Sequence, residues 1–162
     1  MSTRLHLQET LKKLDGVGRV RLCNALKDDG IVNIYIENSN REFNNSFKSI
    51  IKTYVSEVFP CHLEYDIKPY SDVLKEDIPP EVSLPAIVES LALNNPNCNN
   101  SNCRDKLSRA FPFLGEFDLS LNGLYNLELI PKAQLSTHYK QMVEFYGKEL
   151  VTFGLFVTVA KP

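Results

Sequence analysis

Two stretches of this chain repeat the same pattern of hydrophobic and polar positions. Residues 30–69 and 123–162 have equal lengths, and each reads as an alternating apolar run, a helical pattern and a second alternating run closed by Lys-Pro. Alternation is typical of a half-buried strand, and apolar positions three and four apart are typical of an amphipathic helix. The match lies in the apolar phase, while identity is low. Two copies of one supersecondary unit explain it best.

The first copy predicts two antiparallel strands, a helix and a third strand over residues 18–69. Residues 27–30 (KDDG) give a hairpin signal between strands at 18–24 and 31–37. Ser39 and Glu42 have capping-box spacing, which predicts a helix over residues 41–58. Pro60 ends this helix, and residues 62–68 alternate again as a strand. The predicted apolar stripe of the helix consists of Phe43, Phe47, Ile50, Ile51, Tyr54, Val55 and Val58.

The second copy follows the same order over residues 116–162. Residues 116–121 alternate, and Asn122-Gly123 predicts a two-residue hairpin into a strand at 124–130. A helical pattern then covers residues 134–149, and a last alternating run covers 151–160. Each module is therefore predicted as strand, strand, helix, strand.

The N-terminal segment predicts a short amphipathic helix. Ser2 is a suitable cap, and Leu7, Leu11 and Leu14 share one face before Gly16 ends the pattern. A helix of about twelve residues is marginal in water by itself. Either the chain's own core or another subunit must therefore cover its apolar face. We assign Leu7, Leu11 and Leu14 as candidate partner-binding residues.

These elements predict an α+β protein of two duplicated modules, each resembling a ferredoxin-like half. The predicted domains are an N-terminal helical arm (1–17), a first module (18–69), a partly helical linker (70–115) and a second module (116–162). Within the linker, Pro85 precedes a short helical stripe, and the asparagine-rich residues 94–102 predict an exposed loop.

Composition narrows the classes of partner. The chain is 43% hydrophobic and 23% charged with a net charge of -2, so it has no general field that attracts nucleic acid. No apolar run is long enough for a signal peptide or a membrane span. We expect a cytoplasmic protein that neither binds nucleic acid nor crosses a membrane.

The sequence contains few residues in patterns typical of catalytic or metal sites. Cys98 and Cys103 lie five positions apart, a spacing that fits a small-loop disulfide or half a metal site, and the three histidines are scattered. Cys61 and His62 would point to opposite faces of a strand and could not act together. The paired carboxylates at 28–29 and 76–77 occupy a predicted turn and the linker. We expect no catalytic residue, no metal and no cofactor.

Short motifs in both halves resemble known assembly proteins. Residues 58–67 (VFPCHLEYDI), after an amphipathic helix, are similar to the closing module of phage tail baseplate proteins. Residues 117–124 (FDLSLNGL), the break at Pro131 and residues 143–150 (VEFYGKEL) resemble the C-terminal part of TssG-type baseplate proteins of type VI secretion systems. This chain departs from that family in lacking tryptophan and in being shorter.

The resemblance implies a non-enzymatic structural protein, a baseplate wedge component of a contractile injection machine that contacts other subunits of a multiprotein assembly. The alternative is a small-molecule-binding regulatory domain with a ligand between its paired modules. An enzyme would need convergent titratable groups, which the pattern does not show.

Overall fold

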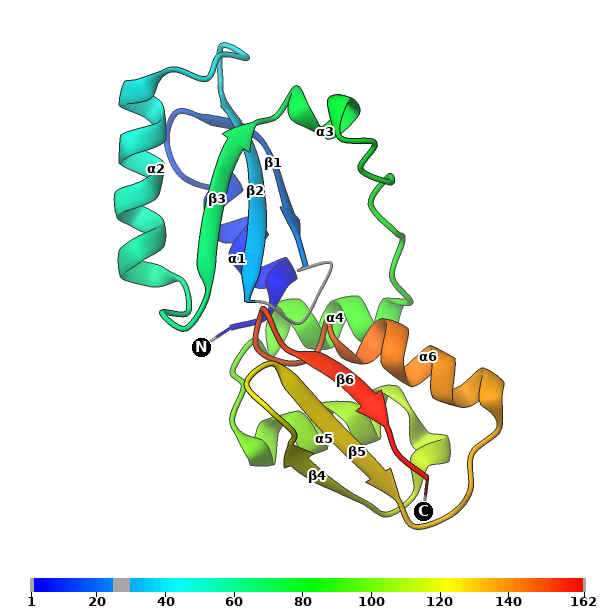
Figure 1. Cartoon of the computed structure of the whole chain (residues 1–162). Coiled ribbons are helices and arrows are strands. Elements are labelled where there is room, and N and C mark those ends of the chain that lie inside the picture. Colours follow the sequence, from blue (N-terminus) through cyan, green and yellow to red (C-terminus); the bar gives the residue numbers. More distant parts are fainter. Residues whose placement is uncertain (1, 25–29, 162) are drawn as a thin grey trace. The chain divides into compact units, whose positions relative to one another are not determined.

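The computed structural model describes residues 2–24 and 30–161, which form two compact units (Figure 1). The first unit is Arg4–Ser83, and the second combines residues 2–3 with residues 84–161. The first contains α1 (Arg4–Lys12), β1 (Val17–Cys23), β2 (Ile31–Asn38), α2 (Asn45–Val58), β3 (Glu64–Pro69) and α3 (Asp72–Lys75). The second contains α4 (Ala86–Asn94), α5 (Asn100–Ala110), the 3-10 helix η1 (Pro112–Leu114), β4 (Phe117–Leu121), β5 (Asn126–Pro131), α6 (Thr137–Gly147) and β6 (Phe156–Val159).

The two units carry three-stranded sheets of the same topology. β1 pairs antiparallel with β2, which pairs in parallel with β3, and β4, β5 and β6 repeat this order. The order strand, strand, helix, strand was predicted from the sequence. The parallel strands are direct neighbours, whereas a ferredoxin-like half has a split βαβ unit. Each sheet is therefore a hairpin continued by an unsplit βαβ unit.

The predicted hairpin turns are only partly described. Residues 27–29 of the first turn, including Asp28 and Asp29, lie outside the described residues. The second turn is longer than Asn122-Gly123 alone, because the Asn122 N–H donates to the carbonyl oxygen of Asn126 and leaves residues 123–125 between them. Gly123 has a φ of 84°, a left-handed conformation that favours glycine.

Neighbouring strands of the first sheet align their apolar side chains. Leu22 on β1, Ile34 on β2 and Ile67 on β3 are register partners and are all buried. Lateral alignment of such side chains forms the continuous apolar face on which helices pack. β2, paired on both sides, is the most buried strand of this unit.

A close backbone approach fixes the end of this sheet. The pairing of β1 with β2 shifts register between Val17 and Val20, which marks a β-bulge. A Cβ atom added at Gly18 would lie 2.5 Å from the carbonyl oxygen of Asn38. Only glycine allows the two strands to approach this closely.

Replacing Gly18 with alanine should therefore destabilise the first unit by about 2–3 kcal/mol, because a backbone oxygen cannot move aside as a side chain can. Gly147→Ala is the matched control. Its Cβ would lie 3.3 Å from the Val157 side chain, and the gain in helix propensity offsets this tight contact. Urea denaturation followed by circular dichroism measures the stability of both variants. Equal losses of stability would contradict the argument that the bulge requires glycine at position 18.

The N-terminal helix α1 is part of the first unit rather than a separate arm. It packs beside β1, and Leu7 and Leu11 are buried at 3% and 0% exposure. The chain's own core therefore covers two of the three leucines that were assigned to a partner. Leu14 lies beyond the end of α1 and stays half-exposed.

Polar side chains of α1 complete the free edge of β1. The Leu22 N–H donates to Oε1 of Gln8 at 2.9 Å, and Arg4 donates to the Leu22 carbonyl oxygen at 3.1 Å. Glu81, from the segment after α3, accepts hydrogen bonds from both Arg4 and Gln8. An unpaired strand edge is a liability in a small sheet. This cluster both satisfies the edge and fixes the position of α1.

The cluster predicts a pH-dependent contribution to stability. Burial by itself raises the pKa of Glu81, but the hydrogen bond from Gln8 and the charge of Arg4 outweigh it and lower the pKa below 4.5. A carboxylate whose pKa is lower in the folded state stabilises the protein above the unfolded value, and this stabilisation disappears as the pH falls through the folded value.

Glu81→Gln should accordingly cost about 1–2 kcal/mol at pH 7, a figure reduced for the partial exposure of Glu81, because the ion pair between buried Arg4 and Glu81 is lost. The difference between wild type and variant should be smaller at about pH 3 than at pH 7, because more of Glu81 is protonated as the pH falls toward its lowered pKa. Urea denaturation at both pH values measures it. An equal difference at both values would mean that the charge of Glu81 contributes nothing.

Most of the expected linker belongs to the core of the second unit. Val88 and Leu91 of α4 and Leu107 of α5 are buried in one cluster with residues of β4, β5, β6 and α6. The asparagine-rich stretch is shorter as a loop than predicted, because α4 runs to Asn94 and α5 starts at Asn100. Asn99 caps α5 by accepting a hydrogen bond from the Asn102 N–H. Asparagine acts here as a helix cap as well as a loop former.

No helix within residues 2–24 and 30–161 is long and apolar enough to cross a membrane.

Candidate functional site

The apolar stripe of α2 is only partly covered by the first unit. Ile51 and Val55 are buried, whereas Ile50 and Val58 are 65% and 46% exposed. Leu107 of α5, by contrast, is fully buried. A helix that leaves large apolar side chains in water beside a hollow is a candidate binding surface.

The start of α2 explains how the hollow forms. Ser39 and Glu42 do not cap the helix, because Arg41 has a φ of 62°, which a right-handed helix cannot include. The helix begins instead at Asn45, and Asn44 accepts a hydrogen bond from the Phe47 N–H at 2.8 Å. The chain between β2 and α2 thus runs as a loop, residues 39–44, and this loop forms one end of the hollow.

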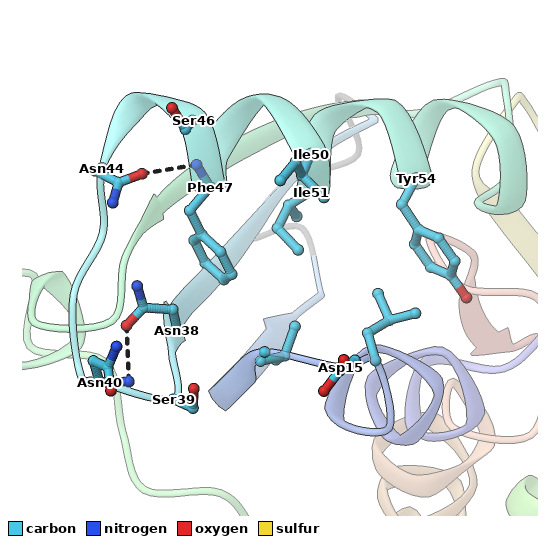
Figure 2. Close-up of a pocket in the computed structure, with 13 residues that line it drawn as sticks. Asp15, Asn38, Ser39, Asn40, Asn44, Ser46, Phe47, Ile50, Ile51 and Tyr54 are labelled. Carbon is cyan, nitrogen blue, oxygen red and sulfur yellow. Dashed lines mark hydrogen bonds between the residues drawn. The ribbon is translucent and has the colours of Figure 1, made fainter.

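We call this hollow the α2 groove, and its volume is about 520 Å³ (Figure 2). It lies between α2, the turn after α1 (residues 13–16) and the loop after β2, all within the first unit. Phe47, Ile51 and Tyr54 point from α2 toward that turn. Its lining consists of Leu14, Asp15, Gly16, Val17, Asn38, Ser39, Asn40, Asn44, Ser46, Phe47, Ile50, Ile51 and Tyr54.

Backbone hydrogen bonds hold two walls of the groove together. The Ser39 N–H donates to the Gly16 carbonyl oxygen at 3.0 Å, which joins the loop after β2 to the turn after α1. Oδ1 of Asn38 accepts from the N–H groups of Asn40 at 3.0 Å and Glu42 at 2.8 Å. An Asx side chain that bonds backbone groups ahead of it fixes a turn. The groove is therefore pre-formed at this end.

The lining determines what the groove can do chemically. Asp15 and Tyr54 are the ionisable side chains among its described lining residues, and they come from different elements. Acid–base or nucleophilic catalysis needs a nucleophile or base held within hydrogen-bond distance of a partner group. Neutral amides and hydroxyls at one end and apolar side chains along the floor suit binding instead.

Leu14 connects the predicted site with the observed one. Of the three leucines expected to meet a partner, Leu7 and Leu11 lie in the core, and Leu14 lines the α2 groove. One feature of the sequence indicates the groove. The apolar stripe predicted over residues 43–58 is too wide for a single small sheet to cover, so some of its side chains must face elsewhere.

Cys61, His62 and His138 do not converge on a site. Cys61 and His62 are exposed in the turn before β3, and His138 is exposed in the first turn of α6. All four cysteines are free thiols, including Cys98 and Cys103. Within the described part of the chain, no group of three or more His, Cys, Asp or Glu side chains is arranged to hold a metal ion.

The chain matches no protein-family model, and no curated protein or solved structure shows significant similarity to it. The likeness to baseplate proteins therefore rests on the sequence motifs alone, and the α2 groove must be interpreted from its own chemistry.

Proposed function

We propose that this protein is a non-enzymatic assembly protein and that the α2 groove is its contact with a partner subunit. The observation that carries the proposal is the exposure of Ile50, at 65%, beside a pre-formed apolar hollow. Exposed apolar surface of this kind costs free energy in water unless a partner covers it.

The occupant that fits best is a helix of the partner that presents apolar side chains one or two turns apart. The groove follows α2 from Ser46 to Tyr54, a rise of about 12 Å at 1.5 Å per residue, which matches two turns of a partner helix. Among its described lining residues only Asp15 carries a charge, so a neutral apolar face complements the groove best. Recognition of an amphipathic helix in an apolar groove is a recurring mode.

The assembly that we propose is a contractile injection apparatus, in which this chain acts as a baseplate wedge component. The support for it is the resemblance of residues 58–67 and 117–124 to baseplate proteins, together with a groove suited to binding rather than catalysis. A cytoplasmic location and the absence of a nucleic-acid partner belong to the same proposal.

Purification of the tagged full chain from its native cells tests the assembly. We expect sheath, spike or wedge subunits with the wild type and their loss with Leu14→Glu, because Leu14 lines the groove without lying in the core. Circular dichroism must show that the variant is folded. Recovery of the same partners with both proteins would exclude the groove as the contact, and recovery of unrelated proteins would exclude the apparatus.

A small-molecule-binding regulator remains the second candidate, because about 520 Å³ is within the range of pockets that hold small ligands. Its discriminating test is thermal melting of the purified protein with a hydrophobic probe such as 1-anilinonaphthalene-8-sulfonate. A rise in melting temperature in the wild type that is absent in Ile50→Glu would favour this candidate.

A further inference from the structure

A lysine is buried in the second unit without a carboxylate partner. Lys106 of α5 has 0% exposure, and its Nζ donates to the carbonyl oxygen of Asn97 at 3.0 Å and approaches Sγ of Cys98 at 3.7 Å. The ion pairs formed by the described residues do not include Lys106. An ammonium group withdrawn from water without a counter-charge costs several kcal/mol. A nearby anion would remove this cost.

The groups that face Cys98 indicate that it supplies the negative charge. Cys103 and Lys106 face it from α5, and Thr152 faces it from the segment before β6. Cys103 is buried and packs beside Cys98, which is half-exposed and whose sulfur also lies 3.0 Å from the carbonyl oxygen of Pro96. Cys98 also lies next to Asn99, the cap of α5, where the helix N-terminus favours negative charge.

The ionisation of the two thiols follows from these contacts. The hydrogen bond from Cys103 and the charge of Lys106 lower the pKa of Cys98 to about 6, although burial acts in the opposite direction. The same hydrogen bond and burial raise the pKa of Cys103. These contacts favour the thiolate form at Cys98 and the thiol form at Cys103.

A purely structural role for Cys98 and Cys103 explains fewer of these observations. Cys98 and Cys103 occupy the N′ and N4 positions of α5, where apolar side chains often pack together as a hydrophobic staple. A staple explains why the two side chains meet. It does not explain why a lysine lies buried beside them, since an apolar residue would fill that position at lower cost.

We propose that Cys98 is a nucleophilic thiolate, oxidised by hydroperoxides and resolved by Cys103 as a disulfide. The Cys98 thiolate attacks one peroxide oxygen, the O–O bond breaks, and the leaving oxygen departs as hydroxide or alkoxide and takes a proton from water. Cys98 is then a sulfenic acid. The sulfur of Cys103 attacks the sulfur of Cys98, its proton leaves with the hydroxyl group as water, and an S–S bond forms. The thiols lose two electrons, which reduce the peroxide.

The first test is the pH dependence of alkylation by iodoacetamide, read for each cysteine by peptide mass spectrometry. The rate at Cys98 should change less than about twofold between pH 6.5 and 7.5, whereas a thiol with the ordinary pKa of about 8.5 gains roughly tenfold. Exposed Cys61 provides an internal reference in the same sample. A tenfold rise at Cys98 itself would overturn the proposal.

Two lysine variants test whether the charge of Lys106 lowers the pKa of Cys98. Lys106→Met should make the rate at Cys98 rise more steeply with pH than in the wild type, because it removes the positive charge while the contact with Cys103 remains. Lys132→Met removes the same charge from an exposed lysine of the same unit and should change nothing. Thermal melting confirms that both variants fold. If Lys106→Met does not fold, the pH dependence of alkylation at Cys98 in the wild type decides whether Cys98 is a thiolate.

The second test adds hydrogen peroxide to the reduced protein. A 98–103 disulfide should form and be reversed by dithiothreitol, Cys103→Ser should stop at a sulfenic acid that dimedone traps, and Cys98→Ser should form neither product. Oxidation of Cys98 to sulfinic acid without a disulfide would overturn the role of Cys103. Equal oxidation of Cys61 and Cys98 would overturn the selectivity.

Discussion

A glutamate in place of Leu11 should unfold the first unit. Leu11 is fully buried at 0% exposure, and α1 packs beside β1, so the substitution places a carboxylate among apolar side chains. The loss of the leucine alone costs about 2–5 kcal/mol, and an unpaired buried carboxylate adds to it. A total above about 4 kcal/mol is enough to unfold many small domains.

Circular dichroism with urea denaturation measures this effect, and Leu14→Glu is the matched control. Leu14 follows the same helix and is half-exposed, so the same added charge should cost under about 1 kcal/mol. A folded Leu11→Glu protein that fails to assemble would mean that α1 contacts a partner after all, as its leucine spacing first suggested.

A glutamate in place of Ile50 should strongly weaken partner binding without affecting the fold. Ile50 is 65% exposed and lines the α2 groove, so a charge there stays in water in the free protein and is buried only in the complex. Central apolar contacts of an interface typically contribute 2 kcal/mol or more, and burying an unpaired charge adds to that loss. We expect affinity to fall about 100-fold.

Ser49→Glu is the control for this prediction, because Ser49 is exposed on α2, adds the same charge and does not line the groove. Its affinity for the purified partner should stay within about twofold of the wild type. Calorimetric titration gives both values. Equal losses in the two variants would indicate a general effect of charge on α2 rather than a contact at the groove.

The sequence located most strands because apolar alternation is a local signal, but the last predicted run, 151–160, is a strand only over Phe156–Val159, since a turn precedes it. Alternation at residues 31–37 reflects a central strand whose neighbours cover it, and the same rule located β4 and β5. Turn lengths were less predictable. Asn122-Gly123 suits a two-residue hairpin, but the observed bond between Asn122 and Asn126 depends on where β5 begins.

The candidate sites were harder to predict because they depend on backbone conformation and burial, which residues close in sequence do not determine. Ser39 and Asn44 are both plausible caps of α2, and the left-handed conformation of Arg41, in the loop after β2, excludes Ser39. This choice of cap creates the α2 groove. Lys106 follows a polar, asparagine-rich stretch that suggests a solvated helix, and only the folded core of the second unit shows it to be buried.

The most direct test of the central claim is photo-crosslinking from inside the α2 groove. A photoreactive phenylalanine derivative replaces Tyr54, which points into the groove, or Lys52, which is exposed on the same helix and does not line it. We predict that position 54 crosslinks to one helix of a partner subunit in cells, that position 52 does not, and that Ile50→Glu removes the crosslink. The same crosslinked partner from both positions, or a crosslink that persists with Ile50→Glu, would contradict the assignment of the groove as the assembly contact.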